Sequence, residues 1–253
     1  MIEVKYPRSR HNWLINRFFL RNPPQNGGGQ IGLFDKLYKK GKSGFNFILH
    51  PKLNKSLEVE IKTRLGIPVR YNSPARTILE NSILPFLAAQ NSGSRVLFVG
   101  CDWYTKHYKG YFKKCAFWTI DPDPAKRRFG SKNHIVGYIE QLEKHFSPEY
   151  FDLIICNGVL GYGLNQLTQA EQAFDSCYTC LRRGGRLLIG REDDLTFLPF
   201  SNDELQSLHK FVPYFFPPLG TTNYSTKPQY NYTFSFFEKP PDVVMSHPDS
   251  HSK

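Results

Sequence analysis

Short runs of apolar residues recur between turn signals from about residue 94 to residue 240. Their length and their content of β-branched and aromatic residues predict strands, most of them buried on both faces. The predicted strands are Arg95–Val99, Ala116–Ile120, His134–Tyr138, Phe151–Cys156, Gly185–Gly190 and Tyr230–Glu238. Most of these alternate with segments of helical character, which is typical of a parallel sheet. The last strand has no helix after it, so we expect it to pair antiparallel at one edge.

Two helices stand out from their spacing of apolar residues. One opens at Ser73-Pro74-Ala75, where serine can cap a helix and proline can begin it, and it ends before Asn91-Ser92-Gly93. The other covers Thr168–Leu181, where apolar residues recur at steps of three and four, and Gly184-Gly185 is expected to stop it. We therefore predict the α/β class, with helices on both faces of a mainly parallel sheet.

The chain divides by pattern into three parts. Residues 1–75 are rich in turn signals and form a predicted basic N-terminal extension, in which Phe45–His50 and Leu57–Thr63 are predicted to be extended, as a small hairpin or edge strands. The sheet domain is predicted to cover residues 76–240. The polar tail, residues 241–253, is predicted to be disordered.

The net charge of +11 is concentrated in the extension. Residues 1–75 hold 14 of the 33 Lys and Arg residues but 4 of the 22 Asp and Glu residues. Such a segment can attract a polyanion or an anionic membrane surface, and it can equally be a solvated basic face. No apolar run approaches the roughly 20 residues that span a bilayer, so no membrane span is expected.

The five cysteines are an odd number at irregular spacing, and charges interrupt every apolar run near the N-terminus. These features predict reduced thiols, no signal peptide and a cytoplasmic location. Cys177 and Cys180 have the spacing of half a zinc site, but no second pair exists, so we expect core packing and no metal.

Two residues mark the ends of neighbouring predicted strands. Gly100 follows the first strand and Asp121 follows the second, about 20 residues later. Ligands of open α/β sheets bind beyond the carboxyl ends of the strands, where a carboxylate can accept hydrogen bonds from both ribose hydroxyls. The alternative is that Gly100 only turns the chain and Asp121 caps the next helix.

From Ser94 to Pro240 the order of these segments resembles the class I S-adenosylmethionine-dependent methyltransferases. The resemblance rests on VLFVG, TIDPDP, HIVGYIEQL, FDLIICNGVLGYG and CLRRGGRLLIG, and the last two are the most specific in combination. It implies a Rossmann-like, mainly parallel, seven-stranded sheet with an antiparallel last strand. It also implies S-adenosylmethionine as the cofactor and methyl transfer by direct displacement, in which the protein mainly positions and desolvates the reactants.

The resemblance implies a cofactor site at the carboxyl edge of the sheet. The methionine and ribose end would be lined by Val99, Gly100 and Cys101, and the ribose hydroxyls would be held by Asp121. The adenine would be contacted by Pro122, Tyr138 and Ile139. The loop beside the sulfonium would be formed by Asn157 and Gly158.

The chain departs from the family pattern in its first motif. Phe98 replaces the usual acid, and Asp102 and Tyr104 replace the second and third glycines. Asp102 could instead supply a carboxylate for the ammonium of the cofactor, and Tyr138 replaces the acid often found beside the adenine. A cofactor-free relative on the same fold is therefore an alternative. A nicotinamide-binding domain is less favoured, because the run after the first strand holds one glycine only.

Acid or base groups for an acceptor are expected at the same edge. The candidates are Tyr162, Glu192, Asp193, Asp194 and His209. The alternative for the three acids is that they cap and solvate a loop. The loop after the fourth strand lacks the Pro-Pro-aromatic signature of enzymes that methylate base amino groups, so a small molecule or saccharide is preferred as acceptor. An RNA-directed enzyme that uses the basic extension and a non-catalytic scaffold remain alternatives.

Overall fold

The computed structural model describes residues 71–194, 196–228 and 230–241, together with residues 57, 59–62, 65, 67 and 69. These residues lie within one compact unit, Lys55–Lys253. Leu57 and residues 59–62 are helical, so the extended conformation predicted for this segment is wrong. Phe45–His50 and the predicted tail beyond residue 241 lie outside the described residues. Among the described residues, no helix is long and apolar enough to cross a membrane.

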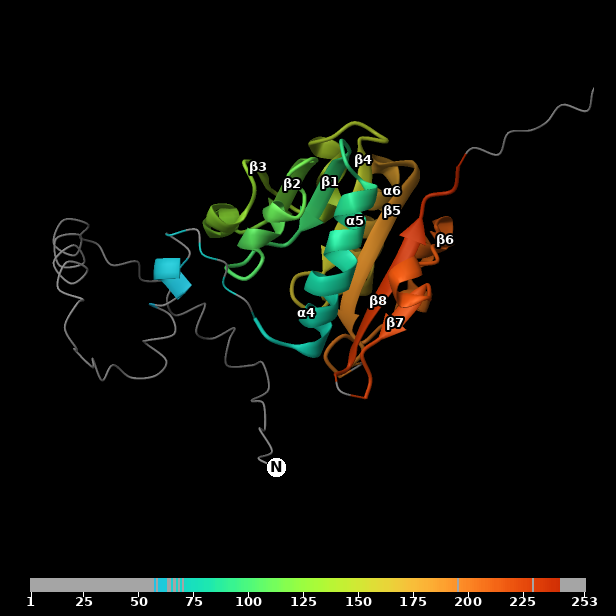
Figure 1. Cartoon of the computed structure of the whole chain (residues 1–253). Helices are drawn as coiled ribbons and strands as arrows, with labels where there is room; N and C mark the ends of the chain where they lie inside the picture. Colours follow the sequence, from blue (N-terminus) through green and yellow to red (C-terminus); the bar gives the residue numbers. More distant parts are fainter. Residues whose placement is uncertain are drawn as a thin grey trace, which may run out of the picture. The chain divides into compact units, whose positions relative to one another are not determined.

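One mixed sheet forms the centre of the fold (Figure 1). Its strands are β1 (Arg95–Val99), β2 (Ala116–Asp121), β3 (Asn133–Val136), β4 (Phe151–Asn157), β5 (Leu181–Glu192), β6 (Val212–Pro213), β7 (Asn223–Ser225) and β8 (Tyr232–Glu238). The order is β3-β2-β1-β4-β5-β8-β6, and β7 also pairs with β8. The first five strands are parallel, and β8 runs antiparallel to β5.

This topology confirms the predicted Rossmann-like α/β class and corrects two details. The described sheet has eight strands instead of seven, because the short strand β7 joins it through β8. The last strand is not at the edge, since β8 lies between β5 and the short strands β6 and β7. The strand β7 has no run of apolar residues, and β6 is two residues long and contains a proline, which explains why the hydrophobic pattern did not reveal them.

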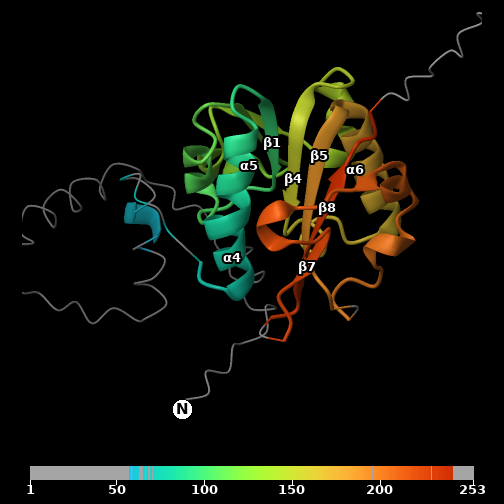
Figure 2. The same cartoon turned by 45° about the vertical axis from the view of Figure 1, so that its right-hand side comes forward.

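The sheet is buried on both faces because successive side chains of its central strands point to opposite sides. In β1, Leu97 and Val99 join one core cluster, while Val96 and Phe98 join the other. Helix α6 (Leu167–Cys180) covers the first face, and helices α4 (Pro74–Ile78) and α5 (Leu84–Gln90) cover the second, as Figure 2 shows.

Helices α4 and α5 are parts of one helical segment with a π-helical turn, η1 (Leu79–Ile83), between them. Ser73 caps the segment, and its hydroxyl accepts a hydrogen bond from the amide of Arg76 at 3.2 Å. The π turn ends just before Pro85, which has no amide hydrogen to donate to the carbonyl four residues earlier. The segment runs against the direction of the parallel strands, so its first turn lies at their carboxyl ends (Figure 1).

Short 3-10 helices connect the outer parallel strands, where segments of helical character were predicted. They are η2 (Lys106–Gly110) after β1, η3 (Pro124–Phe129) after β2 and η4 (Ile139–Lys144) after β3. After β5 come η5 (Asn202–Glu204), η6 (Gln206–Lys210) and η7 (Pro217–Leu219).

Helix α6 ends at Cys180, four residues before the glycine pair that was predicted to stop it. Leu181 is already extended, and Gly184 and Gly185 lie inside β5, where the register against β4 shifts. The ammonium of Lys239, which is 5% exposed, donates to the carbonyls of Tyr178 and Leu181 at 2.9 Å each. A cation from the end of β8 thus stabilises the helix terminus.

Candidate functional site

Two glycine turns lie at the carboxyl edge of the central strands. Gly100, after β1, has φ +80, and Gly158, after β4, has φ +69; both values favour glycine. A Cβ atom on Gly100 would lie 3.2 Å from Cγ1 of Val159, so the two turns are in contact. The amide of Gly158 donates to the carbonyl of Gly190 at 2.8 Å, which fixes the second turn against β5.

Asp121 ends β2 and connects it to the turn after β1. Its Oδ2 accepts a hydrogen bond from the amide of Cys101 at 2.7 Å, and its Oδ1 accepts one from the amide of Asp123 at 2.9 Å. Burial raises the pKa of this carboxyl group, while the two amides oppose the shift. A carboxylate oxygen accepts up to two hydrogen bonds, so each oxygen retains capacity for a ligand.

The loop after β3 lies beside Asp121. The amide of Gly137 donates to the carbonyl of Asp121 at 3.1 Å. Tyr138 is 56% exposed and Pro122 is exposed, so both present apolar surface next to the carboxylate. Ile139 instead belongs to the core cluster under α6. Of the three residues expected at the adenine, Tyr138 and Pro122 are therefore the ones open to a ligand.

Asp102 is already paired within the chain. Its Oδ2 lies 2.6 Å from Nζ of Lys126 on η3, and its Oδ1 accepts from the amide of Trp103 at 2.7 Å. The carboxylate that could have met an ammonium group of a ligand is thus neutralised by a lysine. The sequence pattern around Gly100 holds no signal for this pair, because the two residues are 24 positions apart.

Glu192, at the end of β5, accepts hydrogen bonds from two tyrosine hydroxyls. Its Oε1 accepts from Tyr162 at 3.0 Å and from Tyr230 at 2.8 Å. The ring of Tyr162 is exposed, but desolvation of its hydroxyl and the adjacent carboxylate raise its pKa, and the same causes raise the pKa of Tyr230. Both hydroxyls therefore remain protonated donors at neutral pH, and the carboxylate faces the loop that follows β4.

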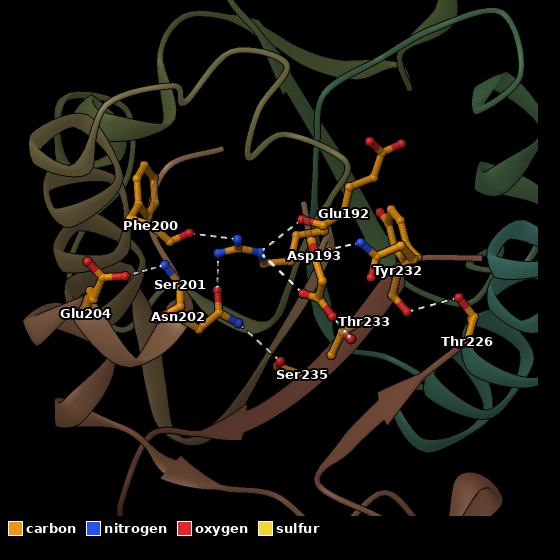
Figure 3. Close-up of polar contacts among 12 residues, drawn as sticks. Glu192, Asp193, Phe200, Ser201, Asn202, Glu204, Thr226, Tyr232, Thr233 and Ser235 are labelled. Atoms are coloured by element: carbon orange, nitrogen blue, oxygen red, sulfur yellow. Dashed lines mark hydrogen bonds and ion pairs between the residues drawn. The ribbon is translucent and has the colours of Figure 1, made fainter. Parts of the chain in front are cut away.

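Asp193 and Asp194 hold the chain after β5 in place. Asp193 forms an ion pair with buried Arg191 and accepts from the hydroxyl of Thr233. Arg191 also donates to the carbonyl of Phe200 at 2.7 Å, and Figure 3 draws Asp193 and Phe200 within one group of polar contacts. Asp194 accepts from the amide and hydroxyl of Thr196.

For these two acids, a structural role in the loop therefore fits the observed contacts better than a role toward an acceptor. His209 lies on η6, where it is exposed and its Nε2 is 3.2 Å from the carbonyl of Asp203. This contact holds His209 within its own segment, whereas Tyr162 and Glu192 do meet each other.

The β4 turn is positioned by a buried tyrosine that sequence reasoning did not single out. The hydroxyl of Tyr232 donates to Oδ1 of Asn157 at 3.2 Å. A Cβ atom on Gly190 would lie 2.2 Å from that same Oδ1, so only glycine leaves room for the asparagine side chain. The tyrosines at alternate positions 230 and 232 could have indicated that the first end of β8 makes polar contacts through hydroxyl groups.

Arg76 is the second residue that the sequence did not reveal. It lies in the first turn of α4, with Cζ 4.2 Å from the ring centroid of Tyr104, and its guanidinium donates to the hydroxyl of Tyr108. The Nε atom of Arg76 is buried without a hydrogen-bond partner. A single arginine after a helix cap has no distinguishing pattern, and only the fold places it against the turn after β1.

Comparison with known proteins agrees with this arrangement. Residues 97–189 match a family described as a methyltransferase domain. This match supports the resemblance to methyltransferases predicted from the sequence, and a domain of this kind implies S-adenosylmethionine as the cofactor. No protein of curated function matches the sequence significantly.

Two solved structures illustrate the similarity. The N-methyltransferase NodS from Bradyrhizobium japonicum is 21% identical, covers 67% of this chain and 98% of its own, and superposes with a TM-score of 0.50. A TehB-like SAM-dependent methyltransferase from Corynebacterium glutamicum is 16% identical, with coverage of 74% and 96% and a TM-score of 0.49. At this level of identity, the likeness to NodS establishes a shared fold.

Proposed function

We propose that this protein is an active S-adenosylmethionine-dependent methyltransferase whose acceptor is a small polar molecule, with a saccharide included in that class. The observation that carries the proposal is the meeting of four elements at one edge: the Gly100 turn, Asp121, the Gly158 turn and Glu192. Parallel α/β sheets bind their ligands at this edge.

The residues present fit an adenosyl group at its sugar and base. The free lone pairs of Asp121 suit two hydroxyl donors, and exposed Tyr138 and Pro122 offer apolar surface for a planar ring. The positive φ of Gly100 and Gly158 lets the backbone approach a ligand closely. Of the cofactor residues expected from the sequence, Asp102 fits least well, because Lys126 holds its carboxylate.

When bound, the cofactor supplies an electrophilic methyl group. The protein then has to orient the acceptor and receive its proton. Glu192 is suited to receive it, because two tyrosine donors fix the carboxylate while the described residues provide no cation that forms an ion pair with it. Tyr162 has an exposed ring whose centroid is 5.1 Å from that of Phe197. This ring offers a surface on which an acceptor can lie.

Binding of the product S-adenosylhomocysteine tests the first part of the proposal without knowledge of the acceptor. We expect saturable binding by isothermal titration calorimetry, with a dissociation constant at least about tenfold higher in Asp121→Asn, since a tenfold change corresponds to about 1.4 kcal/mol. Asp175→Asn is the matched control, because Asp175 is half-exposed on α6 and pairs with Lys210. Absence of binding to the wild-type protein at millimolar ligand would support the non-catalytic scaffold instead.

The catalytic part is tested by incubating the protein and labelled S-adenosylmethionine with pools of small molecules, oligosaccharides and RNA. We expect labelled methyl groups in a small-molecule or saccharide fraction, and loss of that labelling in Glu192→Gln with unchanged affinity for S-adenosylhomocysteine. Labelling confined to RNA would contradict the acceptor class, and undiminished labelling in Glu192→Gln would exclude this carboxylate as the base.

A further inference from the structure

Arg76 carries a partly buried guanidinium on the first turn of α4. The ring of Tyr104 covers one face of the guanidinium, with Cζ of Arg76 4.2 Å from the ring centroid. The ring centroid of Tyr71 is 5.9 Å from the same Cζ atom. Its Nε is buried and makes no hydrogen bond. Among the residues that the structure describes, no carboxylate forms an ion pair with it.

The nearby buried carboxylate of Glu80 is engaged elsewhere. Glu80 accepts from the hydroxyl of Tyr108 at 3.1 Å and lies 3.5 Å from Nε2 of His107. Tyr108 in turn accepts from Arg76, so its hydroxyl separates the two charges. A cation removed from water is costly unless it is paired, and an unmade hydrogen bond at a buried donor adds to that cost. Such an arrangement favours an anionic ligand.

The position of Arg76 indicates which anion it could bind. Tyr104 stands four residues after Gly100, so the guanidinium lies against the turn that follows β1. The first turn of α4, which holds Arg76, also lies at the carboxyl ends of the parallel strands (Figure 1). Arg76 therefore lies at the carboxyl edge, against the turn after β1. Lys126, another cation near the β1 turn, is already paired with Asp102.

We propose that Arg76 binds the carboxylate at the methionine end of the cofactor. This inference rests on the proposed function and assigns a residue to a part of the cofactor that the altered glycine motif leaves without an obvious partner. A guanidinium presents a planar fork of hydrogen-bond donors that matches a carboxylate, and Nε–H is one of those donors. The ring of Tyr104, at the third glycine position of the motif, holds the fork in place.

The experiment compares two ligands that differ only in that group: S-adenosylhomocysteine and its decarboxylated analogue. We expect Arg76→Gln to raise the dissociation constant of S-adenosylhomocysteine at least about tenfold, the range of a lost charge-assisted hydrogen bond, and that of the analogue less than about twofold. Arg76→Lys should recover part of the difference. Arg95→Gln is the matched control, because Arg95 also covers a tyrosine ring, that of Tyr150, but lies at the amino end of β1.

Several outcomes would overturn the inference. Equal losses for both ligands would mean that Arg76 only supports the fold, and urea unfolding of each variant would show that directly. Unchanged affinity for S-adenosylhomocysteine, with weaker binding of a carboxylate acceptor, would assign the same chemistry to the acceptor instead. If the wild-type protein binds S-adenosylhomocysteine but Arg76→Gln binds it equally well, the inference fails while the proposed function stands. If the wild type binds no S-adenosylhomocysteine, both fail.

Discussion

Gly190 is the position where one methyl group should damage both stability and ligand binding. A Cβ atom there would lie 2.2 Å from Oδ1 of Asn157 and 3.0 Å from the hydroxyl of Tyr232. Both atoms belong to the hydrogen bond that positions the turn after β4. In Gly190→Ala the Asn157 side chain therefore has to leave its place.

The magnitude follows from what the displaced side chain leaves behind. Tyr232 is 8% exposed, so its hydroxyl would lose the Asn157 acceptor in a buried setting, which costs about 1–3 kcal/mol. Overpacking adds about 1–3 kcal/mol. We expect Gly190→Ala to lower the free energy of unfolding by about 2–6 kcal/mol when these ranges are combined, and to weaken binding of S-adenosylhomocysteine through the displaced turn.

Urea unfolding measures this loss, with Gly110→Ala as the matched control. A Cβ atom on Gly110 would have no heavy atom within 4 Å, and the residue has no positive φ, so alanine there should be neutral or slightly stabilising. In the Asn157→Ala background, Gly190→Ala should cost distinctly less, because the clashing oxygen is gone. Equal unfolding midpoints for the two glycine variants, or an undiminished cost in that background, would refute the reasoning.

Three further predictions concern the fold and the site. Lys239→Met should lower the free energy of unfolding by about 1–3 kcal/mol, because the ammonium donates to the carbonyls of Tyr178 and Leu181; an unchanged urea midpoint would contradict the capping role. Binding of S-adenosylhomocysteine should fall, as the pH decreases, at a pH above the ordinary value of about 3.9 for Asp, since the pKa of Asp121 is raised. Protonation of a group with a raised pKa does not itself destabilise the fold, so calorimetry should detect this loss before circular dichroism detects acid unfolding. Arg191→Met should loosen the chain after β5, because its guanidinium is 3% exposed and donates to a loop carbonyl; faster proteolysis of that loop would show this, and unchanged proteolysis would oppose it.

The main features of the fold follow from local pattern. Buried strands such as β1 and β4 need continuous apolar runs, and α6 needs apolar residues at helical spacing, so both kinds of element are visible in the sequence. Gly100 and Asp121 were also accessible, because each stands at the carboxyl end of a strand that the pattern defines. The short strands β6 and β7 have two and three residues, too few for a periodic pattern, and depend on pairing with β8.

Pairing between distant residues was decided by the tertiary structure alone. Asp102 meets Lys126, Glu192 meets Tyr230, and Arg76 meets Tyr104, each across a separation that no local spacing encodes. The end of α6 shows the same limit, since Lys239 caps it from a different strand before the glycine pair is reached. Sequence periodicity determines which face of an element is buried, but a charge acquires its partner only when the sheet has brought separate strand ends to one edge.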